Sequence, residues 1–397
     1  MRVLVIHNRY RAERPSGENV LVDTESRLLE KHGCNVERLE VSSDDISQWP
    51  AARKALIPAR VIWSLEGYRL TAEAIRRFRP DIVHVHNTFP LLSPSALWAA
   101  RSSDASVVLT LHNFRPLCPA GSFMRRNRIC EECLGRLPVP AVRHGCYRGS
   151  RVATFPVALM SAVHGLAHTW IRCVDTLVVP SEFARDTYLR AGWPPTKLTV
   201  KYNSVPEPGL RRQGPGRGFV CLARLDPEKG VDVLLRAWSE AFPRGEEELL
   251  VLGSGTREAE LRQAAGARRG IVFLGHVARS RALQLLAEAR ALVVPARYYE
   301  IFGLALVEAF SLGVPVIASK IGALGEIVED GRTGLLVTPD RPEELATALV
   351  RIAASAELSL RLGQGARSAY EARFHPDRTT ESLLAIYRRA VGADVAV

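Results

Sequence analysis

Glu300 and Glu308 enclose the short segment Ile-Phe-Gly-Leu-Ala-Leu-Val, and residues with this spacing can bind a phosphorylated ligand. The apolar run 291–295 predicts a buried strand, and the run 302–312 predicts a helix that ends at Gly313. Glu300 would then lie in the loop at the carboxyl end of a strand. In open α/β sheets, ligands bind at that end of the strands.

The start of this predicted helix offers free backbone N–H groups, which together with the helix dipole favour a phosphate near Phe302 and Gly303. Glu308 follows about one and a half turns later, so its carboxylate can accept hydrogen bonds from a ribose. The spacing therefore suits a diphosphate with an attached diol. The alternative is a solvated helix face that carries two unrelated acidic residues.

Two cations lie on a second loop, upstream of these glutamates. The apolar run 219–223 predicts a strand that leads to Arg224 and Lys229, and Gly230 precedes a predicted helix over 231–238. A guanidinium and an ammonium on one strand-to-helix loop can clamp a diphosphate, although either cation alone would more often be surface charge. The runs 249–252 and 272–277 predict two further strands of the same sheet.

Together these motifs resemble the donor-binding half of glycosyltransferase family 4, a retaining family with the GT-B fold. The matching pieces are Arg224 and Lys229, the turn Gly253-Ser-Gly255, Gly275-His-Val277, the segment from Glu300 to Glu308, and the runs 313–319 and 325–337. The resemblance implies an α/β protein of two facing Rossmann-like domains with parallel sheets.

The N-terminal half resembles the same family. A strand over 2–6 leads to Ser16-Gly17-Glu18, which is similar to the family's glycine loop near the donor phosphates, although relatives often have two glycines there. A strand over 107–111 ends at His112, which matches the family's histidine that faces the reacting sugar.

His84 and His86 alternate on one predicted strand, 81–87, and therefore share a face. One of them could line the acceptor site, but packing in the core explains them equally well.

The resemblance implies a glycosyltransferase of hexosyltransferase type that moves a sugar from a UDP- or GDP-sugar to a saccharide or lipid-linked acceptor, in bacterial surface polysaccharide biosynthesis. Arg224 and Lys229 would stabilise the leaving diphosphate, so no divalent metal would be required. Glu300 and His112 would be catalytic, and Gly17, Phe302, Gly303 and Glu308 would complete the donor site. Two alternatives stay open: a sugar-nucleotide epimerase with the GT-B fold, and a non-catalytic regulatory protein that depends on thiols or zinc.

A chain of 397 residues is long for one hydrophobic core and suits two domains. The stretch 206–218 is rich in proline and glycine and predicts the boundary between them. We expect an acceptor-binding domain over 1–205 with a cysteine-rich insert at 116–149, a nucleotide-sugar-binding domain over 206–375, and a helix over 376–397 that crosses back to the first domain. No apolar run approaches the roughly 20 residues of a membrane span, and the first strand does not resemble a secretory signal, so we expect a cytoplasmic protein.

The net charge of +11 is concentrated in one stretch of the first domain. Its basic residues are Arg125, Arg126, Arg128, Arg136, Arg143, His144, Arg148 and Arg151. Such a patch would attract a lipid-linked pyrophosphate acceptor or the anionic face of the inner membrane, where the protein would be peripheral. Nucleic acid is a poorer partner because no reading module accompanies the patch. Ordinary solubilising charge is the alternative.

Four cysteines lie in the same stretch, at Cys118, Cys130, Cys133 and Cys146. The central Cys-x-x-Cys pair with one cysteine on either side offers four thiolates for a tetrahedral, structural zinc ion. Cytosolic thiols stay reduced, so a metal is favoured over disulfides. A redox-active pair and simple packing are the alternatives. Because the insert shows little helical or strand period, we expect it to need such a cross-link to be ordered.

Overall fold

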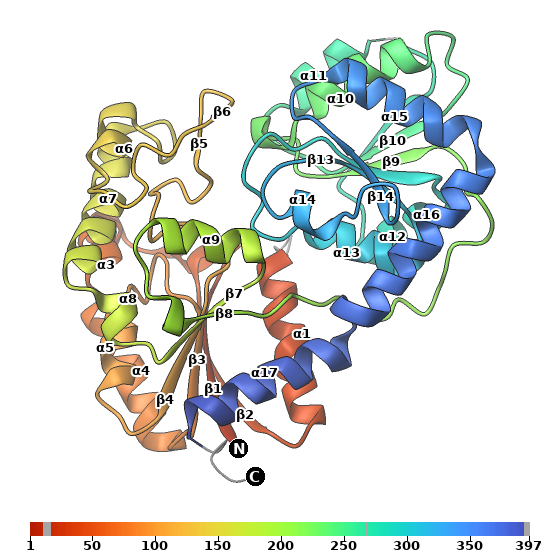
Figure 1. The fold of residues 1–397 in the computed structure, drawn as a ribbon. Coiled ribbons are helices and arrows are strands. Elements are labelled where there is room, and N and C mark those ends of the chain that lie inside the picture. The colour runs from red at the N-terminus through yellow and green to blue at the C-terminus, as the bar shows by residue number, and fades with distance from the viewer. Residues whose placement is uncertain (11–16, 267, 393–397) are drawn as a thin grey trace. The chain divides into compact units, whose positions relative to one another are not determined.

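The computed structural model describes residues 1–10, 17–266 and 268–392, and the chain divides into two compact units (Figure 1). The first unit comprises Met1–Phe123, Cys130–Asn203 and Asp377–Val397, and the second comprises Met124–Ile129 and Ser204–Pro376. Each unit is built on a parallel sheet of six strands with helices on both faces, as Figure 1 shows. The predicted α/β class with parallel sheets is confirmed.

The sheet of the first unit has the strand order β2-β1-β3-β4-β7-β8, and every pair in it is parallel. Its strands are β1 (Arg2–Arg9), β2 (Asn35–Ser42), β3 (Ile82–Asn87), β4 (Ser106–Thr110), β7 (Thr176–Val179) and β8 (Leu198–Val200). Most are near-continuous apolar runs, which is typical of parallel strands that helices cover on both sides.

Helices of the first unit begin at recognisable caps: the side chains of Ser64, Ser150 and Ser181 each accept a hydrogen bond from a backbone N–H of the first turn. The helices are α1 (Gly17–Lys31), α2 (Ala51–Ala55), α3 (Ile57–Ile62), α4 (Leu65–Phe78), α5 (Ser95–Arg101), α6 (Val139–His144), α7 (Arg151–Leu166), α8 (Thr169–Arg172), α9 (Glu182–Arg190) and α17 (Pro376–Ala390), with 3-10 turns at Ser43–Gln48 and Pro195–Lys197.

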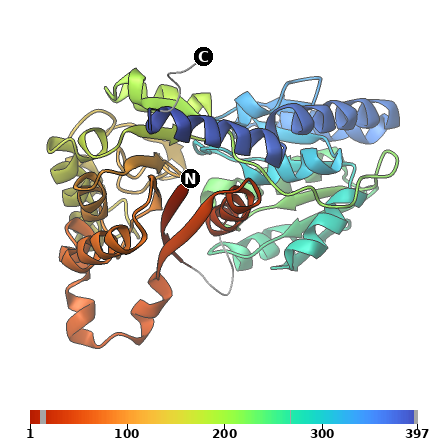
Figure 2. The same ribbon diagram turned by 90° about the horizontal axis from the view of Figure 1, so that it is seen from below.

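The last helix, α17, belongs to the first unit although it follows the whole of the second in the chain (blue in Figure 2). Its buried residues Leu383, Ile386 and Tyr387 lie in the same core as Val5 and Val108 of the sheet. The amphipathic pattern of this helix places its apolar side against that core.

The sheet of the second unit has the order β11-β10-β9-β12-β13-β14 and is also entirely parallel. Its strands are β9 (Phe219–Leu222), β10 (Leu249–Leu252), β11 (Ile271–Gly275), β12 (Ala291–Val294), β13 (Val316–Ser319) and β14 (Gly334–Val337). Its helices are α10 (Val231–Ala241), α11 (Glu258–Ala265), α12 (Arg279–Glu288), α13 (Leu304–Leu312), α14 (Leu324–Ile327), α15 (Pro342–Ala354) and α16 (Ala356–Ala369), with a 3-10 turn at Pro227–Lys229 and a π-helical turn at Tyr370–Phe374.

Strand order decides where each unit can bind a ligand. The order reverses between β9 and β12 in the second unit and between β1 and β3 in the first. Ligands of doubly wound sheets bind beyond the carboxyl ends of the strands at such a switch point. The loops after β9 and β12 carry Lys229 and Glu300. In the first unit, Gly17 begins α1, the helix that follows β1, and His86 lies near the end of β3.

The cysteine-rich insert contains regular structure that its weak sequence period does not show. The insert contains a short antiparallel hairpin of β5 (Met124–Arg125) and β6 (Arg128–Ile129), followed by α6. Two-residue strands are too short to show a period in the sequence, so the pattern could not reveal them.

Among the described residues, no helix combines the length and the apolar character needed to cross a membrane.

Candidate functional site

In the second unit, Lys229, Tyr298 and Glu300 form one hydrogen-bonded cluster. The Lys229 ammonium donates to a Glu300 carboxylate oxygen and to the Tyr298 hydroxyl, at 2.7 Å each. The Tyr298 hydroxyl donates to the same carboxylate oxygen. Two loops that are far apart in the sequence therefore meet at the switch point of the sheet. An ammonium has three N–H bonds, so one stays available for a phosphate oxygen.

Gly230 allows the two loops to approach each other this closely. It has a φ of 67°, and a Cβ atom at this position would lie 1.9 Å from the carbonyl oxygen of Pro295. No side chain fits there, so only glycine can follow Lys229 in this turn. A hydrogen bond of 3.0 Å from the Arg297 N–H to the Glu228 carbonyl oxygen joins the same loops.

The charges in this cluster stabilise one another. Burial alone would raise the pKa of Glu300, but the Lys229 ammonium, its hydrogen bond, the Tyr298 hydroxyl and the Arg224 guanidinium lower that pKa below its ordinary value. Burial alone would lower the pKa of Lys229, and the Glu300 carboxylate raises it instead. At neutral pH the site therefore holds an ionised carboxylate and a protonated amine.

Arg224 lies on the same loop as Lys229 and is held by two carboxylates. It forms ion pairs with Asp226 and, at 2.8 Å, with Glu228. Asp226 in turn accepts hydrogen bonds of 2.9 and 2.8 Å from the backbone and hydroxyl of Thr256. The guanidinium is thus fixed at the carboxyl end of β9, although the two carboxylates offset much of its charge.

Glu308, on α13, pairs with Arg279 at the start of α12. The two guanidinium contacts, at 2.9 and 2.8 Å, both go to Oε1, and no described residue hydrogen-bonds Oε2. Burial raises the pKa of Glu308, and Arg279 opposes that shift. Sequence reasoning missed Arg279 because nothing in the local spacing connects a residue of α12 with Glu308.

Phe302 and Gly303 have different surroundings from those we expected of two donor-binding residues. The Phe302 ring is buried and lies against Phe374, with ring centroids 6.0 Å apart, so only its backbone could approach a ligand. Gly303 precedes α13 with a φ of 91°, where a Cβ would lie 2.9 Å from a Leu324 methyl carbon. This positive φ turns the chain into α13 and leaves the N-terminus of that helix next to Glu300.

In the first unit, His112 follows β4 and is hydrogen-bonded to a second histidine. Its Nε2 lies 2.9 Å from Nδ1 of His86 at the end of β3. Burial lowers the pKa of both rings well below the ordinary value, and the neighbouring histidines and Lys201 lower both further. Both imidazoles are therefore neutral at pH 7, so a single proton is shared between Nε2 of His112 and Nδ1 of His86.

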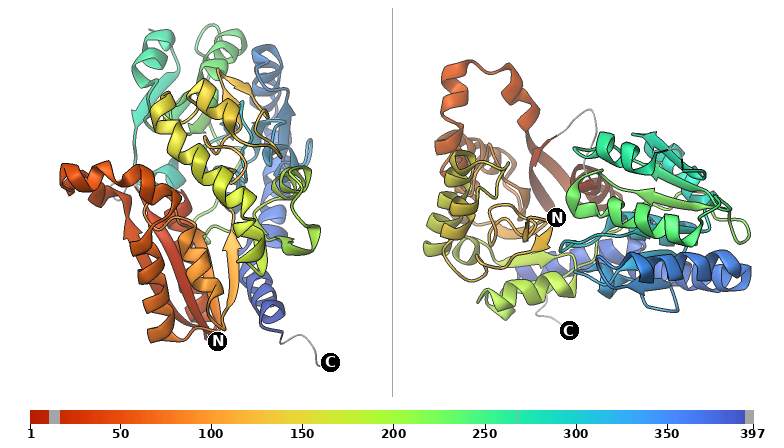
Figure 3. Two further views of the ribbon diagram at one scale, coloured as in Figure 1. Left: turned by 90° about the vertical axis from the view of Figure 1, so that its left-hand side faces the viewer. Right: turned by 90° about the horizontal axis from the view of Figure 1, so that it is seen from above.

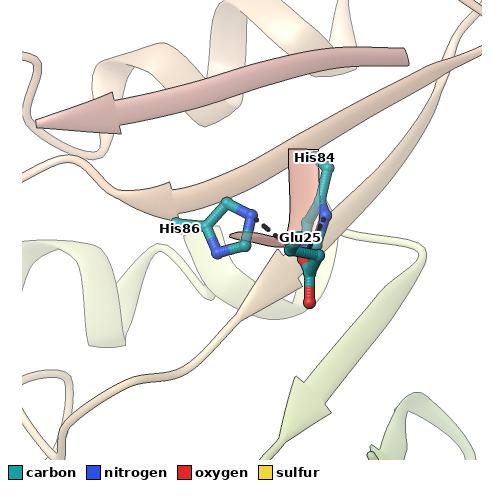
Figure 4. Close-up of side chains that lie close together, drawn as sticks. All are labelled: Glu25, His84 and His86. Carbon is teal, nitrogen blue, oxygen red and sulfur yellow. Dashed lines mark ion pairs between the residues drawn. The ribbon is translucent and has the colours of Figure 1, made fainter. Parts of the chain in front are cut away.

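A buried carboxylate close to His86 bears on which of these nitrogens carries the proton. Glu25 Oε1 lies 3.5 Å from His86 Nε2 and 3.6 Å from His84 Nδ1. Figure 4 shows how the three side chains lie together. A carboxylate favours the tautomer of His86 with its proton on Nε2, which makes His86 Nδ1 an acceptor. With that tautomer of His86, His112 donates from Nε2 and presents the lone pair of Nδ1. Such a lone pair can accept a hydrogen bond from a sugar hydroxyl.

Glu25, His84 and His86 also come close enough together to suggest a metal site, with ligand atoms within 4.8 Å of one another. The Lys201 ammonium already forms an ion pair with Glu25, and both side chains are buried. His84 is neutral, because burial lowers its pKa to about 4, and its Nδ1 lies 2.6 Å from the Tyr387 hydroxyl. Because Lys201 supplies the positive charge, a second cation would be repelled.

Gly17, which we expected in a phosphate-binding loop, is the first residue of α1; residues 11–16 of that loop lie outside the described residues. Next to it, Glu18 accepts a hydrogen bond of 3.2 Å from the Tyr10 hydroxyl. Burial raises the pKa of Glu18 to about 7, although Tyr10 and the Arg115 guanidinium lower it. A carboxyl group that is half-protonated at neutral pH repels a phosphate less than an ordinary glutamate.

Glu18→Gln is expected to stabilise the protein above pH 7. The folded pKa of about 7 exceeds the ordinary value of 4.5, so the folded state loses stability as pH rises from 4.5 to 7. The neutral variant avoids this loss and should gain up to about 3 kcal/mol at pH 8 and nothing at pH 4.5. Urea unfolding at both pH values measures the difference. An equal effect at both pH values would contradict the raised pKa.

All four cysteines of the insert lie in one region. Cys118 and Cys133 are buried, Cys130 and Cys146 are half-buried, and all are free thiols. Burial and, to a smaller extent, the other three cysteines raise the pKa of Cys133 to about 12, so each of these cysteines lies near enough to act on it electrostatically. Among the described residues, however, these sulfurs do not meet the 4.8 Å spacing that Glu25, His84 and His86 meet. The structural zinc ion stays a prediction.

If zinc binds these cysteines, purified protein should contain about one zinc per chain, with four sulfurs at about 2.3 Å by X-ray absorption. Cys133→Ser should lose the metal and destabilise the insert, because metal binding and local folding share one free energy. Cys173→Ser, a substitution of a buried cysteine outside the insert, is the matched control and should keep it. Wild-type protein without metal would contradict the prediction.

Both halves of the chain match known families of glycosyltransferases. Residues 2–204 match the family described as "Glycosyl transferase 4-like domain", and residues 216–355 match "Glycosyl transferases group 1". The chain is a glycosyltransferase of this family. Its architecture is GT-B, with two Rossmann-like units, as the resemblance in the sequence implies.

Several bacterial enzymes are similar to this glycosyltransferase in sequence. It is 35% identical over 197 residues to a D-inositol 3-phosphate glycosyltransferase of Acidothermus cellulolyticus, covering 46% of the chain and 43% of that relative. It is 27% identical over 330 residues to a glycogen synthase of Mycobacterium tuberculosis, covering 79% and 70%. The chain thus spans less than half the length of the inositol phosphate glycosyltransferases it matches.

Solved structures share the fold along nearly the whole chain. A sucrose-phosphate synthase from Thermosynechococcus elongatus superposes with a TM-score of 0.72 at 18% identity, covering 99% of this chain and 100% of that one. A glycosyltransferase from Rickettsia africae gives 0.69 at 17% identity, covering 100% and 99%. Anabaena HepE, solved with UDP and glucose, gives 0.65 at 18% identity, covering 97% and 98%. At these identities the likeness establishes the fold.

Proposed function

We propose that the protein is a retaining hexosyltransferase that moves a sugar from a UDP- or GDP-sugar to a saccharide or lipid-linked acceptor. The observation that carries this proposal is the Lys229–Tyr298–Glu300 cluster at the switch point of the second sheet. The similarity to Anabaena HepE, whose structure holds UDP and glucose, supports a nucleotide-sugar donor. The proposed setting is bacterial surface polysaccharide biosynthesis at the cytoplasmic face of the inner membrane.

In the proposed reaction, the bond between the anomeric carbon and the diphosphate oxygen breaks, and a bond from that carbon to an acceptor oxygen forms on the same face. The acceptor's proton leaves with the diphosphate. Negative charge grows on the leaving group, and Lys229 with Arg224 and the N–H groups at the start of α13 stabilise it. These fixed positive groups support a reaction without a divalent ion.

Glu300 is ionised in this scheme and accepts hydrogen bonds from the sugar hydroxyls, so its negative charge stabilises the oxocarbenium-like sugar. Glu308 accepts hydrogen bonds from the ribose through Oε2. His112 accepts from a sugar hydroxyl through Nδ1, because its Nε2 is engaged by His86.

A product analysis tests the proposal. The protein is incubated with UDP-, GDP- or ADP-sugars and simple saccharide acceptors in the presence of EDTA, and the new glycosidic linkage is assigned by NMR. We expect transfer from a UDP- or GDP-sugar with the anomeric configuration of the donor. An inverted product would refute retention. Interconversion of the nucleotide sugar without an acceptor would favour the epimerase, and donor binding without any turnover would favour a regulatory protein.

A further inference from the structure

One face of α7 exposes apolar side chains along its whole length. Val152 is 85% exposed, Phe155 57% and Leu166 70%, and Leu159 and Val163 between them are also exposed. Steps of three and four residues place all five on one side of the helix. The other side is buried, so this exposed stripe is additional to the face that packs on the first unit.

The segment before α7 extends this apolar surface. Leu137 and Val139, at the start of α6, are both more than half exposed, and α6 packs against α7. The left view of Figure 3 shows α7 crossing the near side of the first unit. Scattered exposed apolar residues are ordinary, whereas five along one side of α7, with Leu137 and Val139 at the neighbouring α6, point to a partner.

Basic residues dominate the charges around this patch, and the acidic Glu132 beside it pairs with His144 of α6. No aspartate or glutamate occurs between Cys133 and Val174. Arg136, Arg143, Arg148 and Arg151 are exposed at the amino-terminal end of α7 and in the segment that leads to it, and none forms an ion pair with any described residue. These arginines therefore have no countercharge within the structure and are available to an external anion.

We propose that this α7 face, defined by the apolar stripe and the four arginines, docks on a bilayer surface with anionic headgroups. A helix with an apolar side and flanking cations lies in the plane of such a surface, with its apolar residues among the upper acyl chains and its cations among the headgroups. A second copy of the chain is disfavoured as the partner because it would bring the two sets of arginines together.

Docking places the first unit next to the compartment where a lipid-linked acceptor resides. The docking proposal rests on the proposed function in one respect: the lipid-linked acceptor makes a membrane the expected partner. Vesicle binding and sugar transfer are separate measurements, so failure of one can be told from failure of the other.

Vesicle flotation tests the docking face with the full chain. Wild-type protein should float with phosphatidylcholine vesicles that contain phosphatidylglycerol, and much less with phosphatidylcholine alone. The triple variant Val152→Ser/Phe155→Ser/Leu159→Ser should lose at least about tenfold in binding, since three exposed apolar groups no longer enter the bilayer. Val272→Ser/Leu274→Ser, which removes two exposed apolar side chains of β11, is the matched control and should bind as wild type.

Substitution of the arginines tests vesicle binding independently of the apolar residues. Arg148→Gln/Arg151→Gln should weaken binding to the anionic vesicles about 25-fold, because each cation near such a surface contributes roughly fivefold. Added salt should weaken wild-type binding in the same direction. No flotation of wild type, or equal flotation of the wild type and the triple variant, would overturn the proposal. A dimer that the triple variant dissociates, without vesicle binding, would show instead that this face joins two copies.

Discussion

Lys229→Ala is expected to lower kcat/KM for sugar transfer by at least about a hundredfold. The ammonium contributes a charge-assisted contact worth roughly 1.5 to 3 kcal/mol, and this contact strengthens as the diphosphate gains charge. Its loss also leaves the buried Glu300 carboxylate without its cation, which raises the pKa of Glu300 and disturbs its position. The loss should persist at saturating donor, because the contact acts on the leaving group.

Arg236→Ala is the matched control for this variant. Arg236 lies on α10, soon after Lys229 in the chain, and its side chain is largely exposed, with Asp232 at 4.0 Å. An exposed pair at that distance contributes little, so transfer should stay close to wild type. If Lys229→Ala kept transfer within about threefold of wild type with an intact fold, the cation would have no role in the reaction.

Glu25→Gln and Lys201→Met are each expected to destabilise the first unit by about 3 to 5 kcal/mol. These two side chains form an ion pair and are 9% and 4% exposed, so removal of either leaves the other as an uncompensated buried charge. The double variant leaves no charge behind and should cost much less than the sum of the two. Urea unfolding followed by circular dichroism measures all three.

Glu258→Gln is the control for that cycle, because Glu258 pairs with Arg262 on the surface of α11 and should contribute at most about 1 kcal/mol. Single variants of the Glu25–Lys201 pair that cost less than about 1 kcal/mol would show that water reaches it. The tautomer assigned to His112 would then have no support, since it depends on a buried carboxylate next to His86.

The strands and loops of the second unit could be predicted from the sequence because their signals are local. Apolar runs gave the strands β9 and β12, Gly313 ends α13 with a φ of 76°, and the residues after each strand fall at the sheet's carboxyl edge. Tyr298 was missed because two tyrosines precede Glu300 and their spacing does not show which one points toward Lys229. The ring of Phe302 packs in the core, so the predicted role of this residue in the donor site would fall to its backbone.

The network behind His112 could not be predicted because it depends on tertiary contacts. Glu25 and Lys201 are 176 residues apart in the chain, and Tyr387 reaches His84 from a helix 303 residues away. The alternation of His84 and His86 showed that they share a face, but not what that face contacts. His86 is buried in the core and its Nδ1 lies 2.9 Å from His112 Nε2, whereas a place in the acceptor site stays a prediction.

Calorimetric titration of the full chain with UDP, GDP and ADP in the presence of EDTA tests most directly whether fixed cations hold the donor's diphosphate. We expect one of the three nucleotides to bind without a divalent ion, the matching monophosphate to bind more weakly, and Lys229→Ala to weaken binding of the diphosphate. Absence of binding by all three, or binding only after Mg²⁺ or Mn²⁺ is added, would contradict a diphosphate site built from Lys229, Arg224 and the start of α13.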